Sequence, residues 1–225
     1  MNYLSHGYRF FDDPLFMAGT AVPDWLSVVN RKVRTRKRLV TPVVESTDNE
    51  EIRRIGNGIL QHHHDDDTFH RSEIFMGLEA KLGAEFRRHL PDKYDHRPGF
   101  LGHIVVELML DATIAANHSD YLDRYYATMD LVDPELIQKT VNLMSTRKTD
   151  RLAWFIDRFR KERFLYDYVD DSGMFYRLNQ VLTRVRLPHM PEDCLSVFPF
   201  ARELLHVHWK SLLEYVANTK QTPDS

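Results

Sequence analysis

The chain of 225 residues contains one cysteine, Cys194, and this scarcity excludes two structural classes. A single thiol cannot form an internal disulfide framework, and it cannot supply a zinc site built from cysteines. One free cysteine also suits a reducing compartment. The first thirteen residues lack the charged and apolar regions of a secretory signal peptide, so we expect a cytoplasmic protein.

Long apolar runs, β-type patterns and a strong net charge are also missing. No run of about 18 apolar residues is present, so we expect no membrane-spanning helix. The net charge is only −3, which does not indicate a protein that binds polyanions in bulk. Nine glycines, ten prolines and few alternating β-branched runs predict a mainly helical chain. We therefore expect an all-α protein of about eight to ten helices in one continuous domain, with a metal-binding core in 1–118 and a helical extension in 119–225 packed on it.

Two stretches repeat metal-ligand side chains every four residues. They are His62, Asp66 and His70 within 61–70, and His103, Glu107 and Asp111 within 102–111. Four residues of an α-helix turn by about 400° and rise by about 6 Å, so each trio lies along one helix face. Two such faces turned toward each other would offer imidazoles and carboxylates to one or two divalent ions, with Mn, Fe, Zn and Mg as candidates.

The second trio lies in the most apolar segment, where residues 100–116 predict a central helix. His103, Glu107 and Asp111 are its only ionisable side chains. Buried carboxylates need a cation or hydrogen-bond donors. Pairing with an arginine from elsewhere, or with histidines without metal, stays open as an alternative. For the 61–70 stretch, the alternative is an exposed capping turn.

Further helices follow from capping signals and apolar spacing. Asp13-Pro14 begins one of them, and Asp24 after Pro23 is interpreted as a cap of the next. Gly56 and Gly58 weaken their helix but allow another helix to approach closely. The other expected helices are 47–64 with Thr47 or Asp48 as cap, 71–90 ended by Pro91, and helices over 134–144, 150–169, 172–186 and 192–218.

Residues 31–38 hold six basic side chains in eight positions. Such a run is commonly a solvated segment, and its functional interpretation is a patch for phosphate or for an acidic partner protein. Arg31, Arg34 and Arg36 are the candidate phosphate contacts. The run is too short and too poor in aromatic residues to indicate a nucleic-acid partner.

Four motifs follow one another along the first half of the chain: MNYLSH at 1–6, MAGTAVPDW at 17–25, ILQHHHDDDTFH at 59–70 and GFLGHIVVELMLD at 99–111. In this order they resemble the acyl carrier protein phosphodiesterase family, a divergent helical relative of the HD-type metal phosphohydrolases. The same motifs are similar to those of the zinc-dependent phospholipase C family. The resemblance covers about residues 1–118 and implies an HD-like or phospholipase C-like helical metal site. The matching positions are His6, Asp24, His62, Asp66 and either Glu107 or Asp111.

A metal-dependent phosphoesterase is the function these features favour. His6, Asp24, His62, Asp66, His103 and Glu107 would hold one or two ions that activate water for attack on phosphorus. Asp66, Asp111 and His70 are the candidate catalytic groups, and the substrate would be a phosphorylated small molecule or an acidic carrier protein. Two alternatives stay open, di-iron oxygen chemistry in a helical bundle and a non-enzymatic interaction protein.

Overall fold

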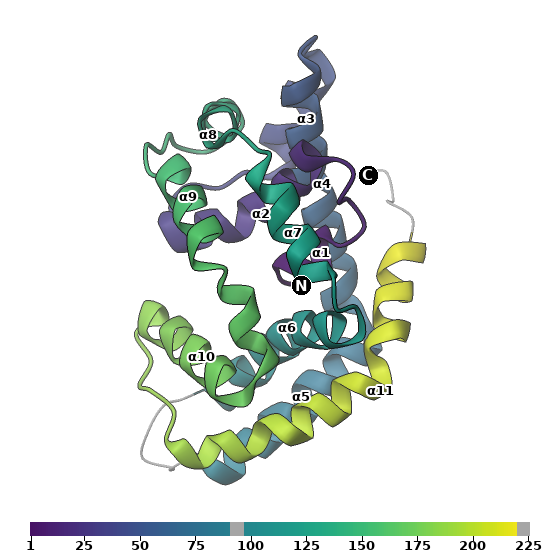
Figure 1. The fold of residues 1–225 in the computed structure, drawn as a ribbon, viewed down its shortest axis with the longest axis vertical. Helices are drawn as coiled ribbons and strands as arrows, with labels where there is room; N and C mark the ends of the chain where they lie inside the picture. Colours follow the sequence, from purple (N-terminus) through teal and green to yellow (C-terminus); the bar gives the residue numbers. More distant parts are fainter. Residues whose placement is uncertain (91–96, 220–225) are drawn as a thin grey trace. The chain divides into compact units, whose positions relative to one another are not determined.

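The structure, a computed structural model, describes residues 1–90 and 97–219, and all regular elements within them are helical (Figure 1). The expected all-α class is confirmed, with eleven α-helices in these residues in place of the eight to ten expected. The α-helices are α1 (Tyr3–Gly7), α2 (Pro14–Val29), α3 (Lys37–Ser46), α4 (Glu50–Arg71), α5 (Glu73–His89), α6 (Pro98–Asn117), α7 (Tyr121–Asp130), α8 (Pro134–Leu143), α9 (Leu152–Glu162), α10 (Asp171–Val185) and α11 (Val197–Asn218). Two 3₁₀ helices, η1 (Phe164–Val169) and η2 (Glu192–Ser196), precede α10 and α11.

The helices belong to two compact units whose segments alternate along the chain. We call them the α2 unit, Tyr3–Asp66 with Asp120–Phe164, and the α6 unit, Met1–Asn2 with Asp67–Ser119 and Leu165–Ser225. Along the chain, the α6 unit gives way to the α2 unit after Ser119, and the chain returns to the α6 unit at Leu165. Helix α4 contributes its residues through Asp66 to the α2 unit and its last turn to the α6 unit.

Helix α2 is the central element of the α2 unit and packs against α1, α7, α8 and α9. It begins as expected, because the Asp13 side chain accepts a hydrogen bond from the Phe16 amide at 3.2 Å. The interpretation of Asp24 as a cap is wrong, since Asp24 lies inside this helix. Pro23 does not end the helix because the following residues Trp25 and Leu26 are fully buried and hold the next turn in place.

Glycines bring α2 and α4 into backbone contact. A Cβ atom added to Gly19 would overlap the Ile55 carbonyl of α4, and one added to Gly58 would overlap the Phe16 carbonyl of α2. The expectation of a close helix approach at Gly58 is confirmed. Gly56 serves a different neighbour, because a Cβ there would collide with Val44 of α3.

Helix α4 begins later and runs further than expected. Its cap is neither Thr47 nor Asp48 but Asn49, whose side chain accepts from the Ile52 amide at 3.1 Å. Thr47 supports Asn49 through a bond between its hydroxyl oxygen and the Asn49 amide. The helix continues to Arg71, so the acidic histidine stretch is helical throughout and is no capping turn.

Helix α6 is the central element of the α6 unit, as expected from its apolar composition, and packs against α5, α10 and α11. Gly102 of α6 lies against the backbone of α5 at Gly83, where no Cβ would fit. Figure 1 shows α11 lying along α5. By length and composition α6 could cross a membrane, but 61% of its apolar window is buried within the protein, which is typical of a core helix.

Two expected helices are interrupted. The one predicted over 150–169 ends at Glu162, because Arg163 adopts a left-handed conformation with φ 43°. Phe164 then turns inward and its ring contacts Phe159 at 5.3 Å, a tertiary contact that overrides the helical spacing. The last helix starts only at Val197, after η2. The expected stop at Pro91 lies outside the described residues.

The α2–α4 contact yields a stability prediction. Replacing Gly58 by alanine forces the two helices apart, and we expect a loss of roughly 1–3 kcal/mol in the free energy of unfolding. The measurement is urea denaturation followed by circular dichroism. Gly77→Ala is the matched control, because a Cβ on Gly77 of α5 meets nothing within 4 Å. This control should stabilise by up to about 1 kcal/mol, and a neutral Gly58→Ala would contradict the packing described.

Candidate metal centre

Two imidazoles and one carboxylate converge inside the α2 unit. We call this group, formed by His6 of α1 with His62 and Asp66 of α4, the His6 cluster. Nε2 of His6 lies 3.2 Å from one oxygen of Asp66, and Nε2 of His62 lies 3.5 Å from the other. The two rings stack with their centroids 4.1 Å apart. His6 is fully buried, whereas Asp66 is partly exposed.

Local structure explains how the three side chains meet. The four-residue spacing places His62 and Asp66 on the same face of α4. Helix α1 brings His6 to that face by packing against α2 and α7. The next residue, Gly7, lies so close to the Tyr125 ring of α7 that a side chain would not fit. The cluster therefore depends on tight packing at α1 as well as on the spacing within α4.

An oxygen atom faces the far side of each imidazole ring. Nδ1 of His62 lies 2.8 Å from the Thr20 carbonyl. A carbonyl can only accept, so Nδ1 carries a proton and Nε2 is the nitrogen turned toward Asp66. Nδ1 of His6 faces Asp65 at 3.7 Å. An imidazole whose second nitrogen faces a carbonyl or a carboxylate is the usual arrangement of a metal-binding histidine.

Asp65 is itself held in place. Arg9 donates to one of its oxygens at 2.6 Å, and the Gln61 side chain donates to the other at 2.8 Å. Asp65 is fully buried. Burial favours its neutral form, but the nearby His6 and the charge of Arg9 outweigh this effect and lower the pKa of Asp65. Nδ1 of His6 therefore faces a carboxylate that is charged at neutral pH.

The donor atoms fit a divalent cation. Ligand atoms about 2.1 Å from a tetrahedral ion are roughly 3.4 Å apart. In the His6 cluster one donor atom of each residue lies within 4.8 Å of the other two, so small side-chain movements would bring all three to one ion. Neither ring nitrogen of His6 makes a hydrogen bond with the described residues, although both are buried. Mixed imidazole and carboxylate donors suit Zn, Mn or Fe. Three protein ligands would leave coordination positions for water or substrate.

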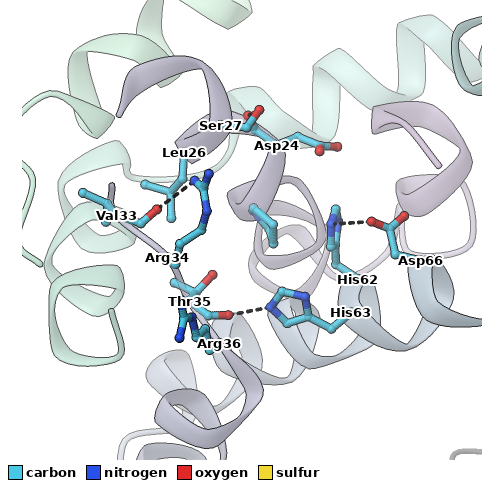
Figure 2. A pocket seen from close by; sticks show the side chains of 11 residues that line it. Asp24, Leu26, Ser27, Val33, Arg34, Thr35, Arg36, His62, His63 and Asp66 are labelled. Carbon is cyan, nitrogen blue, oxygen red and sulfur yellow. Dashed lines mark hydrogen bonds and ion pairs between the residues drawn. The ribbon is translucent and has the colours of Figure 1, made fainter. Parts of the chain in front are cut away.

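A pocket of about 270 Å³ lies beside the His6 cluster, within the α2 unit. Figure 2 shows Arg34 on one side of the pocket and His62 with Asp66 on the other. Asp24 of α2, Arg36 and His63 also line it. Nε2 of His63 lies 2.5 Å from the Thr35 carbonyl. The pKa of His63 is lowered mainly by burial and next by the charge of the nearby His62. His63 is therefore neutral at neutral pH.

The arginines of the pocket wall carry positive charge without a carboxylate partner. In the described part of the chain, neither Arg34 nor Arg36 forms an ion pair with an acidic side chain. Partial burial and then the charges of Arg31 and Arg36 lower the pKa of Arg34, which shows that these cations repel one another. A phosphate group in the pocket would relieve this repulsion.

A second group of ligand-type side chains lies in the α6 unit. We call it the Glu107 cluster, formed by His70, His103 and Glu107. The same Glu107 oxygen lies 3.0 Å from Nε2 of His70, 3.5 Å from Nε2 of His103 and 3.1 Å from the Met1 amino group. The imidazole rings stack at 4.8 Å. This carboxylate thus interacts with three nitrogen groups, so the Glu107 cluster already forms an ion-pair network.

The expected site residues are therefore divided between the units. His6, His62 and Asp66 meet, with Asp24, Arg34 and Arg36 around the adjoining pocket. His103, Glu107 and His70 meet in the other unit. Asp111 belongs to neither group. It is buried on α6. The pKa of Tyr168 is raised first by the burial of Tyr168 and then by the charge of Asp111. Arg31 is exposed and does not line the pocket.

Sequence reasoning missed the groups that lie against the candidate ligands. Thr20 acts through its backbone carbonyl, which no side-chain motif reveals. Arg9 reaches Asp65 across 56 positions of sequence. Only Gln61 and Asp65 carried a local signal, because residues four apart on a helix are neighbours. No protein-family model, no curated protein and no solved structure matches this chain.

The charge state of His6 predicts that metal binding depends on pH. Burial lowers its pKa, but Asp65 and Asp66 raise it more, so the net pKa of His6 is above the ordinary value. A cation bound to Nε2 must displace this proton. Isothermal titration of Zn²⁺ into the metal-free protein should therefore show affinity that increases from about pH 6 to pH 8 and a heat that varies with the ionisation enthalpy of the buffer. Affinity independent of pH and buffer would contradict the assignment.

For the Glu107 cluster we expect a pH dependence of the opposite sign, and the quantity that changes is the stability of the fold. The hydrogen bond to Glu107 raises the pKa of His103 more than burial lowers it. The contribution of a histidine with a raised pKa is complete below its unfolded pKa of about 6.5 and is lost as pH rises through the folded pKa. With chelator present, the Tm difference between the wild type and His103→Asn should be largest near pH 5.5 and should shrink above about pH 7.5. A difference that grows with pH would contradict the ion pair.

Proposed function

We propose that the protein is a metal-dependent phosphoesterase whose metal centre is the His6 cluster. One observation carries this proposal. Two imidazoles with their outer nitrogens facing acceptors turn Nε2 toward Asp66 at the wall of a pocket, and unpaired arginines line the opposite wall. Candidate metal ligands and positively charged side chains thus lie around one cavity. The proposal depends on residues of the α2 unit alone.

Each side chain has a role in this proposal. His6, His62 and Asp66 hold the cation. Asp24 lines the same pocket and is the candidate for a further oxygen ligand. When bound, a divalent ion such as Mn, Fe, Zn or Mg supplies a more acidic water and neutralises negative charge on a phosphate. Arg34 and Arg36 bind the phosphoryl oxygens and stabilise the charge that builds up on them. His63, neutral at neutral pH, is available as a proton acceptor.

The substrate in this proposal is a phosphate ester small enough, in its reacting part, for a cavity of about 270 Å³. The family resemblance of residues 1–118 favours phosphodiesters and adds an acidic carrier protein as one candidate. A phosphorylated small molecule is the other. The remaining expected ligands, His103 and Glu107, are candidate donors for a second ion in the α6 unit.

The proposal is tested by elemental analysis of the purified protein together with hydrolysis of bis-p-nitrophenyl phosphate and p-nitrophenyl phosphate. We expect close to one ion bound at the His6 cluster of each protein molecule. We also expect a chelator to abolish the hydrolytic activity. His62→Ala and Asp66→Ala should each lose the ion and reduce activity by roughly a factor of 100 or more. His206→Ala is the matched control, because His206 is exposed on α11.

The arginines of the pocket wall should affect substrate binding and leave metal binding unchanged. Arg34→Ala should keep the metal but raise KM by roughly a factor of 10. Arg147→Ala, an exposed cation that does not line the pocket, is the control. Full metal content in both ligand variants, or activity that resists chelation, would contradict the proposal. Two bound irons with redox-active spectra would favour oxygen chemistry, and a metal-free, catalytically inert protein would favour an interaction role.

A further inference from the structure

The structure joins two basic segments that lie far apart in the sequence. Thr146, in the connection between α8 and α9, donates from its amide to the Arg34 carbonyl at 3.0 Å. Its hydroxyl accepts from the Arg34 amide at 3.1 Å and donates to the Lys32 carbonyl at 3.0 Å. These bonds hold residues 31–38 against residues 145–151 within the α2 unit. We call the two segments together the basic surface.

The basic surface has a strongly positive net charge, whereas the net charge of the whole chain is negative. Nine lysines and arginines and one acid, Asp150, amount to a net charge of +8. The chain as a whole carries −3, so all its other residues together carry −11. Seven of the nine cations are exposed. Lys37 apart, none of the nine forms an ion pair with a carboxylate in residues 1–90 and 97–219.

Two large apolar side chains flank the same connection. Leu143, at the end of α8, is 61% exposed, and Trp154, in the first turn of α9, is 54% exposed. The helix ends that carry them are tied together, because Asn142 exchanges hydrogen bonds with Thr149 and Gln138 accepts from the Ala153 amide. The exposed leucine and tryptophan are therefore held beside the cations.

This combination fits the surface of an anionic membrane. Clustered lysines and arginines are attracted to acidic lipid headgroups, and tryptophan and leucine enter the interface between headgroups and acyl chains. Single-stranded nucleic acid requires open aromatic rings for base stacking. Here two guanidiniums, of Arg151 and Arg158, already lie 5.7 Å and 5.8 Å from the centre of the Trp154 ring. Leu143 would contribute nothing to a phosphate backbone.

We propose that the basic surface docks the protein on membranes rich in anionic lipid. Leu143 and Trp154 enter the interface, and the cations of 31–38 and 145–151 contact the headgroups. This inference does not depend on phosphoester hydrolysis, since none of the cluster ligands takes part. Arg34 and Arg36 also line the pocket, so the variants below leave them unchanged.

Vesicle sedimentation of the full chain tests the inference. Vesicles of phosphatidylcholine with about 30 mol% phosphatidylserine should bind the protein at least roughly 10-fold more tightly than phosphatidylcholine alone, and about 1 M salt should remove most of this binding. Arg147→Glu with Lys148→Glu should weaken it by roughly a factor of 10 or more. Trp154→Ala should weaken it at both low and high salt, because its contribution is apolar.

The matched control is Lys81→Glu with Arg87→Glu, the same change of charge at two exposed positions of α5. Circular dichroism and Tm establish that each variant is folded. The inference is supported if only the variants of the basic surface lose binding. It is overturned if the wild type ignores anionic vesicles, if the control loses as much binding as the basic-surface variant, or if a single-stranded oligonucleotide binds tightly while vesicles do not.

Discussion

The convergence of His6 and His62 on Asp66 is the interaction on which the proposed metal centre depends. Both rings turn Nε2 toward the same carboxylate because their Nδ1 atoms face the Thr20 carbonyl and Asp65. Buried imidazoles stacked at 4.1 Å, beside carboxylates, are costly unless a proton or a cation balances the charge. In the metal-free protein the proton on His6 supplies this balance, and in the proposed holoprotein the ion replaces it. The same geometry therefore accounts for the charge balance of the buried site and supports the proposed metal centre.

The fold supports this geometry through close backbone packing. Gly19 and Gly58 allow α2 to lie directly against α4, and this contact sets the Thr20 carbonyl within reach of His62. Gly7 allows α1 to lie against Tyr125 and carry His6 into the core. Small residues in these positions are thus part of the site although they carry no chemistry. The pocket wall is shaped separately, because Thr146 holds the segment that presents Arg34.

Local features of the site were predictable from the sequence, whereas its assembly was not. The spacing of His62 and Asp66 predicts a shared helix face because helix geometry is a property of neighbouring residues. The all-α class and the central position of α6 follow from composition and periodicity in the same way. The single ladder of His62, Asp66 and His70 was divided, however, between the His6 cluster and the Glu107 cluster. That division depends on which segments pack together, and spacing carries no information about it.

Elements ended or continued against their local signals for the same reason. Helix α9 ends early because Phe164 packs against Phe159, and α2 continues past Pro23 because Trp25 and Leu26 are buried. Arg9, Asp65 and Thr20 became visible only when distant segments were placed side by side. The motifs thus predicted ligand types, and tertiary packing selected the residues that orient them.

The most direct test of the metal centre is anomalous diffraction from crystals grown with Zn²⁺ or Mn²⁺, recorded on both sides of the metal absorption edge. The account predicts a peak bonded to Nε2 of His6, Nε2 of His62 and a carboxylate oxygen of Asp66, with Nδ1 of His62 still donating to the Thr20 carbonyl. A peak elsewhere in the α2 unit, or a His6 cluster that stays free of metal while the protein binds the ion, would contradict it.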